Sequence, residues 1–181
     1  NIVILGAGFG GLRTALKLEK ELKKSHIPPF AKASEGQGEW AIILVDKNTY
    51  QTYTPALYEA ASAYRWKGVE SMQKFEELLG GSLCLSMQEV AAGKNITFTQ
   101  GEVAGVDFWN NEVKLLNGDS IHYEYLVFAL GSETVYYGIK GAEKCCYDLK
   151  TTEDAFRIRS RIEDVFSQKR SGDAVRIVVV G

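Results

Sequence analysis

The sequence predicts an α/β fold in which a parallel sheet is combined with an inserted antiparallel β-meander. Three continuous apolar runs, at residues 1–5, 40–45 and 125–130, are typical of parallel strands buried on both faces. An amphipathic helical pattern separates the first two runs. The Asn-Gly step at 117–118 is a hairpin signal between two short strand-like segments.

The first strand is expected to stop at Gly6, and a helix is expected from Gly11 to about Lys24, because Leu and Ala recur there at helical spacing. Residues 26–39 hold two prolines and two glycines, which predicts a surface loop. The second strand, residues 40–45, ends at Asp46, so the chain begins with a strand–helix–strand unit.

The remaining elements are expected in the following order along the chain. They are a loop leading into a short helix at 49–63, a helix at 69–79, a strand at 95–99, meander strands at 102–108, 112–116 and 120–123, the buried strand at 125–130, a helix at 152–168 with Thr151 or Thr152 as N-cap, and a buried parallel strand at 175–180.

A glycine motif joins the first strand to the first helix, with Gly6, Gly8 and Gly11 in the pattern GxGxxG. Gly6 permits the tight turn, Gly8 lets the backbone approach a pyrophosphate, and Gly11 lets the helix pack closely on the strand. The N–H groups that open the helix would face the anion. The motif therefore predicts a Rossmann-like dinucleotide site, with a plain glycine turn as the alternative reading.

Asp46 closes the second strand, where an acid typically binds ribose hydroxyls and repels a 2′-phosphate. It lies farther from Gly11 than the usual spacing of about 20 residues, which the loop at 26–39 would explain. The alternative is a solvated acid at a strand end. Gly131, after the strand at 125–130, is expected either to end the strand or to let the chain pass close to a cofactor.

Composition excludes several classes of protein. The net charge of −2 offers no basic field for nucleic acid, and no apolar run approaches the length of a membrane span. Three cysteines, two of them adjacent at 145–146, make no disulfide framework and favour a reducing cytoplasmic setting. The two histidines and these cysteines lack metal-ligand spacing, so no metal site is expected.

Four segments together resemble the type II NADH dehydrogenases, within the FAD-dependent pyridine nucleotide-disulfide oxidoreductases. They are NIVILGAGFGGL at 1–12, VDKNTYQTYTPALYEAAS at 45–62, YEYLVFALGSET at 123–134 with GIKG at 138–141, and LKTTEDAFRIRSRIEDVF at 149–166. The first and third are shared with the wider superfamily, whereas the second and fourth are more particular to this family.

The resemblance implies a cofactor-binding role for a set of residues that would surround FAD, and it implies no catalytic acid or base. Gly6, Ala7, Gly8, Phe9, Gly10 and Gly11 would wrap the pyrophosphate, Asp46 and Lys47 would meet the adenosine ribose, Gln51 and Thr54 would approach from the following loop, Val103 would touch adenine through its backbone, and Ala129 and Gly131 would line the other side.

The resemblance further implies hydride transfer from NADH to FAD and on to quinone, with NADH a substrate of the full-length protein. We expect the 181 residues to be an N-terminal part, with an FAD-binding domain at 1–148, a linking helix at 149–174 and the first strand of an NADH-binding domain at 175–181, opened by Gly181. The isolated part would be inactive. The location would be the cytoplasm, or the cytoplasmic or matrix face of an energy-transducing membrane reached through a later segment, and a homodimer is compatible with the sequence.

Three alternatives stay open at this point. One is another two-dinucleotide flavoprotein, such as a ferredoxin or rubredoxin reductase. A second is a non-catalytic NAD-binding module, which the meander and the glycine at 181 disfavour. A third is a part that folds without cofactor, in which residues 177–180 fill a place in the parallel sheet.

Overall fold

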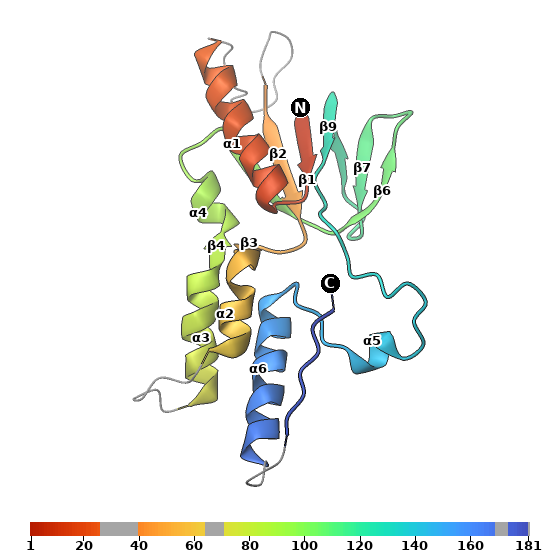
Figure 1. The fold of residues 1–181 in the computed structure, drawn as a ribbon. Helices are drawn as coiled ribbons and strands as arrows, with labels where there is room; N and C mark the ends of the chain where they lie inside the picture. The colour runs from red at the N-terminus through yellow and green to blue at the C-terminus, as the bar shows by residue number, and fades with distance from the viewer. Residues whose placement is uncertain (26–39, 64–70, 169–173, 181) are drawn as a thin grey trace. The chain divides into compact units, whose positions relative to one another are not determined.

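The computed structural model describes residues 1–25, 40–63, 71–168 and 174–180 (Figure 1). The chain forms two compact units. The first contains residues 1–51 and 85–133, and the second contains residues 52–84 and 134–181. The predicted loop at 26–39 lies outside the described residues.

A four-stranded parallel sheet forms the centre of the first unit. Its strands are β1 (Ile2–Leu5), β2 (Ile42–Asp46), β5 (Ile96–Gln100) and β9 (Tyr125–Phe128), in the order β5-β2-β1-β9. The strands expected at 1–5, 40–45, 95–99 and 125–130 are thus confirmed, with boundaries that differ by one or two residues.

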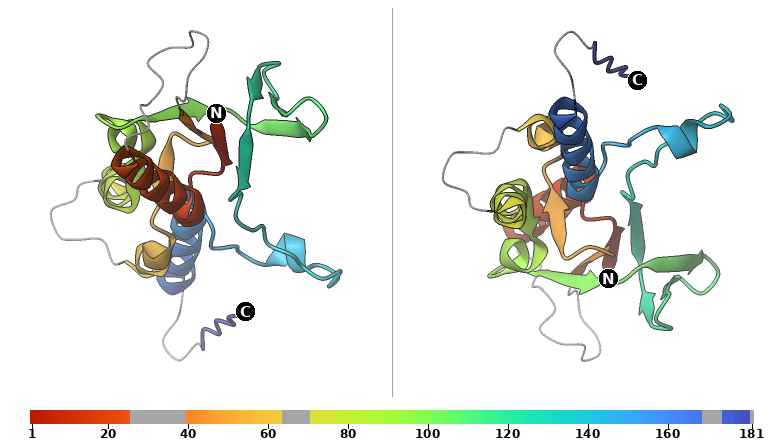
Figure 2. Two further views of the ribbon diagram at one scale, coloured as in Figure 1. Left: turned by 90° about the horizontal axis from the view of Figure 1, so that it is seen from above. Right: turned by 90° about the horizontal axis from the view of Figure 1, so that it is seen from below.

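Both faces of β1 and β2 are covered, which explains why these two strands are continuous apolar runs. The burial predicted for residues 125–130 is wrong, because Tyr125, Phe128 and Leu130 are more than half exposed. Helix α1 (Phe9–Lys24) packs along β1, β2 and β5, where Ile4 and Leu44 join Ala15 of the helix in one buried cluster (Figures 1 and 2). On the other face, Val3 and Val113 belong to a second cluster that the meander closes. Helix α1 begins two residues before the predicted Gly11.

The predicted meander is present as an antiparallel sheet of β6 (Val103–Asp107), β7 (Glu112–Leu115) and β8 (Ser120–His122). Its turns use left-handed backbone at Asn111, with φ 53°, and at Gly118, with φ 93°. Asparagine and glycine tolerate this conformation better than other residues, which is why the Asn-Gly step marked the second turn.

Helices dominate the second unit. They are η1 (Thr54–Ala56), α2 (Leu57–Ser62), α3 (Met72–Leu83), α5 (Ala142–Cys145) and α6 (Thr152–Ser167). Their shared core includes Leu57 of α2, Leu83 of α3 and Ala155 of α6. A buried guanidinium joins α3 to α6, because Arg159 pairs with Glu76 at 2.9 Å.

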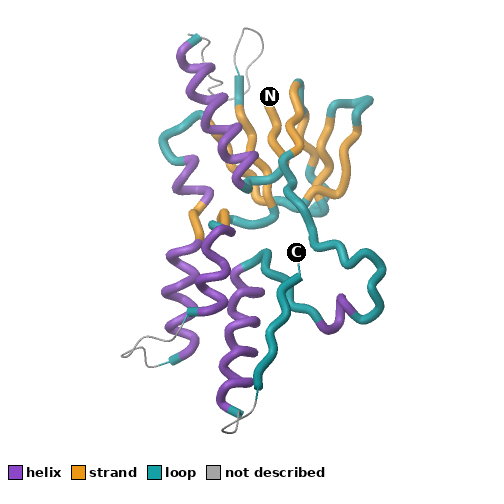
Figure 3. The backbone as a smooth tube through the Cα atoms, viewed as in Figure 1, coloured by secondary structure: helices purple, strands orange, loops and turns teal. Residues whose placement is uncertain are grey.

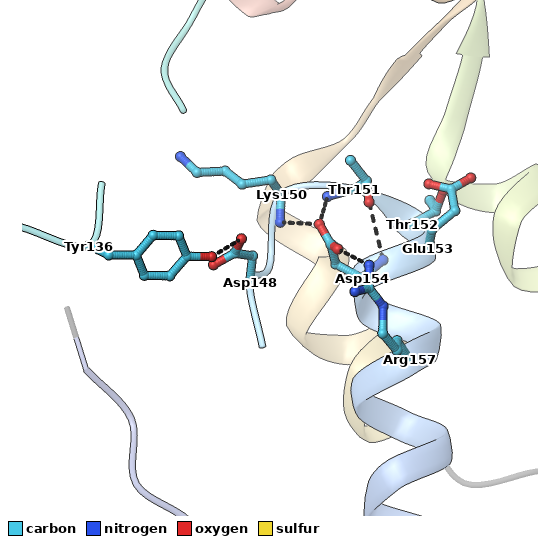
Figure 4. A network of polar contacts seen from close by, with 8 residues as sticks. All are labelled: Tyr136, Asp148, Lys150, Thr151, Thr152, Glu153, Asp154 and Arg157. Carbon is cyan, nitrogen blue, oxygen red and sulfur yellow. Dashed lines mark hydrogen bonds and ion pairs between the residues drawn. The ribbon is translucent and has the colours of Figure 1, made fainter. Parts of the chain in front are cut away.

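The start of α6 is fixed by polar contacts (Figure 4). Thr151 is the N-cap, and its hydroxyl accepts the N–H of Asp154 while the Asp154 carboxylate accepts the Thr151 N–H, forming a capping box. Just before the helix, the phenol of Tyr136 donates to the Asp148 carboxylate at 2.7 Å. This bond raises the pKa of Tyr136 to about 12, with burial as the second cause.

Four short elements were not predicted. They are β3 (Tyr50–Thr52), β4 (Cys84–Ser86), α4 (Met87–Ala91) and α5, and β3 pairs with β4. The helix expected at 69–79 is α3, which continues to Leu83. No helix in the described ranges has both the length and the apolar character that crossing a bilayer requires.

The predicted buried strand at 175–180 is wrong for this chain. Residues 174–180 have no regular structure, and Ile177 to Val180 are 66% to 90% exposed (Figure 3). The proposal that residues 177–180 fill a place in the parallel sheet is therefore wrong as well, because the described sheet consists of β5, β2, β1 and β9. An apolar run becomes a strand only when a neighbour pairs with its backbone and covers its side chains.

Candidate cofactor-binding site

The carboxyl ends of the four parallel strands meet at one edge of the sheet in the first unit. β1 leads into Gly6, β2 ends at Asp46, β5 is followed by Gly101 and β9 by Ala129. From β1 the chain continues to β2 and β5 on one side of β1, and it then crosses to β9 on the other side. This edge is therefore a topological switch point, where open α/β sheets bind their ligands.

Two glycines of the motif are demanded by the fold itself. Gly6 has φ 97°, and a Cβ there would lie 2.3 Å from the carbonyl oxygen of Ala129. A Cβ on Gly11 would lie 1.8 Å from the carbonyl oxygen of Gly6. Side chains at either position would collide with backbone, so these two glycines bring α1, β1 and the chain after β9 into close contact.

Gly8 is different, because no contact among the described residues requires a glycine there. Its φ of −69° and ψ of −170° suit any residue, and a Cβ would meet no atom within 4 Å. Gly8 and its neighbours Phe9 and Gly10 are exposed at the start of α1. The motif thus leaves open space beside the backbone at the position where the sequence predicts a pyrophosphate.

The start of α1 suits a negatively charged group. Its N-cap is Gly8, which has no side chain to cap the helix, and no acid lies in the first turn. The partial positive charge of the helix dipole at this end is therefore not offset by a carboxylate in the first turn.

A buried acid fixes the other end of α1 to the sheet. Glu19 is 7% exposed, pairs with Lys23 and accepts the N–H of Asn95, which precedes β5, at 3.4 Å. The hydrogen bond from Lys23 lowers the pKa of Glu19, and burial opposes this shift. The hydrogen bond to Asn95 thus links the C-terminal half of α1 to the chain just before β5.

Asp46 lies beside the glycine loop, in contact with its backbone. One oxygen, Oδ2, accepts the N–H of Ala7 at 2.7 Å, and Oδ1 accepts the N–H of Asn48 at 2.8 Å. The side chain is half-buried, whereas the neighbouring Lys47 is exposed.

The chain after β5 comes to the same place. Gly101 N–H donates to the Asp46 carbonyl at 2.9 Å, and the side-chain amide of Gln100 donates to the Lys47 carbonyl at 3.2 Å. Val103, half-buried, follows two residues later at the start of β6. Gln100 and Gly101 were not predicted from the sequence, although a polar residue and a glycine at a strand end were the available signal.

The chain after β9 closes the opposite side of the glycine loop. Ala129 N–H donates to the Leu5 carbonyl at 2.8 Å, and the Ala129 side chain lies 3.3 Å from a Cβ placed on Gly11. Gly131 is exposed with φ 79°, a conformation that favours glycine.

Two predicted residues belong to other elements, β3 and η1. Gln51 is buried in β3, with 6% of its surface exposed. Thr54 is exposed in η1 of the second unit, so it does not belong to the edge described above. Among the described residues, no group of three or more potential ligands could hold a metal ion.

Comparison with known proteins identifies relatives over nearly the whole chain. The chain is 30% identical over 184 residues to demethylphylloquinone reductase NdbB of Synechocystis sp. The alignment covers 99% of this chain and 39% of that protein. The chain is 28% identical over 185 residues to the type II NADH:quinone oxidoreductase of Staphylococcus haemolyticus, with the same coverage. The chain thus spans about two fifths of the length of these relatives. The resemblance to type II NADH dehydrogenases is confirmed.

Solved structures share the fold. The sulfide:quinone oxidoreductase of Aquifex aeolicus matches with a TM-score of 0.68 at 22% identity, covering 92% of this chain and 32% of that one. NDH2 of Plasmodium falciparum matches with a TM-score of 0.64 at 22% identity, covering 92% and 29%. The predicted fold class is confirmed. The family model of the pyridine nucleotide-disulphide oxidoreductases matches residues 1–181, and the chain belongs to this family.

Proposed function

We propose that this chain is the FAD-binding part of an NADH:quinone oxidoreductase. The observation that carries the proposal is the open space beside Gly8 at the switch point of the sheet, between Asp46 on one side and Ala129 on the other. The relative from Staphylococcus haemolyticus is an NADH:quinone oxidoreductase, which supports the choice of reaction.

The residues present fit an FAD molecule lying across the ends of the strands. The backbone from Gly8 to Gly10 would hold the pyrophosphate at the start of α1, and Asp46 would accept ribose hydroxyls. Val103 and Gly131 would flank the cofactor, with Gln51 of the same unit as a further contact.

Bound FAD would supply the redox chemistry, which is the acceptance of hydride from NADH and the delivery of electrons to quinone. The chain's own task is to bind and orient the cofactor. We propose no catalytic acid or base among these residues. The GxGxxG pattern occurs once in the sequence, so we expect the chain alone to bind FAD without turning over NADH. A place at the cytoplasmic or matrix face of a membrane, where quinone is available, belongs to the same proposal.

A competition titration tests the proposal against its main alternative. The chain is titrated with FAD, with FMN, which lacks the adenosine monophosphate half, and with NAD. We expect ADP to compete with FAD and FMN to bind weakly, because the contacts proposed above are to the pyrophosphate and adenosine. We expect FAD to bind more tightly than NAD, because the resemblance to type II NADH dehydrogenases assigns this glycine motif to FAD. Tight binding of NAD with weak binding of FAD would instead establish a non-catalytic NAD module.

A further inference from the structure

The glycine loop is tied to β2 by two successive N–H groups. Gly6 N–H donates to the Val45 carbonyl at 2.7 Å, and Ala7 N–H donates to Oδ2 of Asp46 at 2.7 Å. Along a regular strand, successive N–H groups point to opposite sides. The left-handed conformation of Gly6, with φ 97°, breaks this alternation and lets both groups face β2.

The Ala7 N–H is bonded by a side chain and not by a backbone carbonyl. β1 and β2 are in register up to Leu5 and Val45, and the Asp46 carboxylate supplies the acceptor for the next donor on the turning loop. The side chain is itself held in position, because its other oxygen accepts the N–H of Asn48 at 2.8 Å. An N–H bonded to a carboxylate forms a shorter and stronger bond than one bonded to a neutral acceptor.

We infer that Asp46 is a positioning residue, which holds the glycine loop in its ligand-ready shape through the Ala7 N–H before any cofactor binds. The Ala7 N–H is thereby committed to the loop, and the anion is left to the N–H groups from Gly8 onward. Each carboxylate oxygen accepts more than one bond, so the same side chain still has capacity for ribose hydroxyls. The expected effect of Asp46 on cofactor affinity rests on the proposed function, whereas its effect on the conformation of the glycine loop does not.

Asp46→Asn tests the inference with little change in shape. An amide has a single, uncharged acceptor oxygen, so the Ala7 N–H either loses its partner or keeps only a weaker bond to a neutral oxygen. We expect the Ala7 amide proton of the cofactor-free variant to exchange with solvent about ten- to a hundredfold faster, as for loss of a bond to a charged acceptor. Asp107→Asn is the matched control, because the Asp107 carboxylate accepts the N–H groups of Trp109 and Asn110 in the meander and should leave Ala7 unchanged.

Inorganic pyrophosphate separates positioning from ribose binding, because it has no ribose. A residue that touches only ribose would leave pyrophosphate affinity unchanged, or would raise it once its negative charge is removed. Positioning of the loop predicts weaker pyrophosphate binding in Asp46→Asn. Affinity that is unchanged or higher would overturn this part of the inference, and Ala7 exchange equal to that of the wild type would overturn all of it.

The wild-type chain provides a measurement that holds even if the variant does not fold. A scalar coupling across the hydrogen bond, between the Ala7 nitrogen and the Asp46 carboxyl carbon, is expected in the cofactor-free chain. Absence of this coupling in a well-resolved spectrum contradicts the inference. A chain that shows the coupling but binds no FAD would refute the proposed function alone.

Discussion

Alanine substitutions at Gly8 and Gly11 should separate cofactor binding from folding. At Gly11 a Cβ would lie 1.8 Å from the Gly6 carbonyl oxygen, so helix and loop must part by more than about 1.5 Å in a close-packed region. We expect Gly11→Ala to cost about 3 kcal/mol or more of the free energy of unfolding, as overpacking does at its upper range. Gly8→Ala meets no atom and should change stability by about 0.5 kcal/mol at most.

The effects on binding should follow the opposite pattern for a variant that is fully folded. Gly8→Ala places a methyl group in the space proposed for the pyrophosphate, so FAD affinity should fall about tenfold, equivalent to about 1.4 kcal/mol, and Gly8→Leu should abolish it. Gly105→Ala is a matched control, since a Cβ there also meets nothing within 4 Å and Gly105 lies in the meander.

Urea unfolding and flavin-fluorescence titration measure the two quantities. Equal destabilisation of the chain by Gly8→Ala and Gly11→Ala would contradict this separation of binding from folding. It is also contradicted if Gly8→Leu binds FAD as well as the wild type.

Three further outcomes concern titrating groups. The Lys23 hydrogen bond lowers the pKa of Glu19, so the ionised Glu19 stabilises the fold above pH 4.5 and this stabilisation is lost as the pH falls. Glu19→Gln should therefore make the free energy of unfolding depend less on pH in the acid range. The bond to Asp148 raises the pKa of Tyr136 to about 12, so its stabilisation persists below pH 10 and disappears as the pH rises toward 12, which the ultraviolet absorbance of phenolate will follow; a normal tyrosine titration would contradict this. Burial raises the pKa of the Cys84 thiol, so a disulfide reagent should modify it more slowly than the two exposed thiols, and equal rates would exclude its protection.

The parallel sheet and the glycine loop could be predicted because each residue there obeys a local rule. Strands covered on both faces read as unbroken apolar runs, and Gly6 and Gly11 are required by backbone contacts that any such motif makes. The meander was predictable from Asn117-Gly118, because few residues accept the φ of 93° found at Gly118.

Other features depend on partners distant in sequence. Strands of three residues, such as β3 and β4, are too short to show a period, and their pairing joins residues more than thirty positions apart. The run at 175–180 has the composition of a buried strand, but composition does not reveal whether a neighbouring strand is present. The contact of Asp46 with Ala7 was likewise hidden, since the pattern predicted a ribose ligand and not a partner for the loop.

The most direct test of the central claim is the visible absorbance spectrum of the purified chain after addition of FAD and thorough desalting. The proposal predicts flavin absorbance that stays with the wild-type protein and is missing from Gly8→Leu. A colourless wild-type chain that retains NAD in the same procedure would contradict the claim that this edge of the sheet is an FAD site.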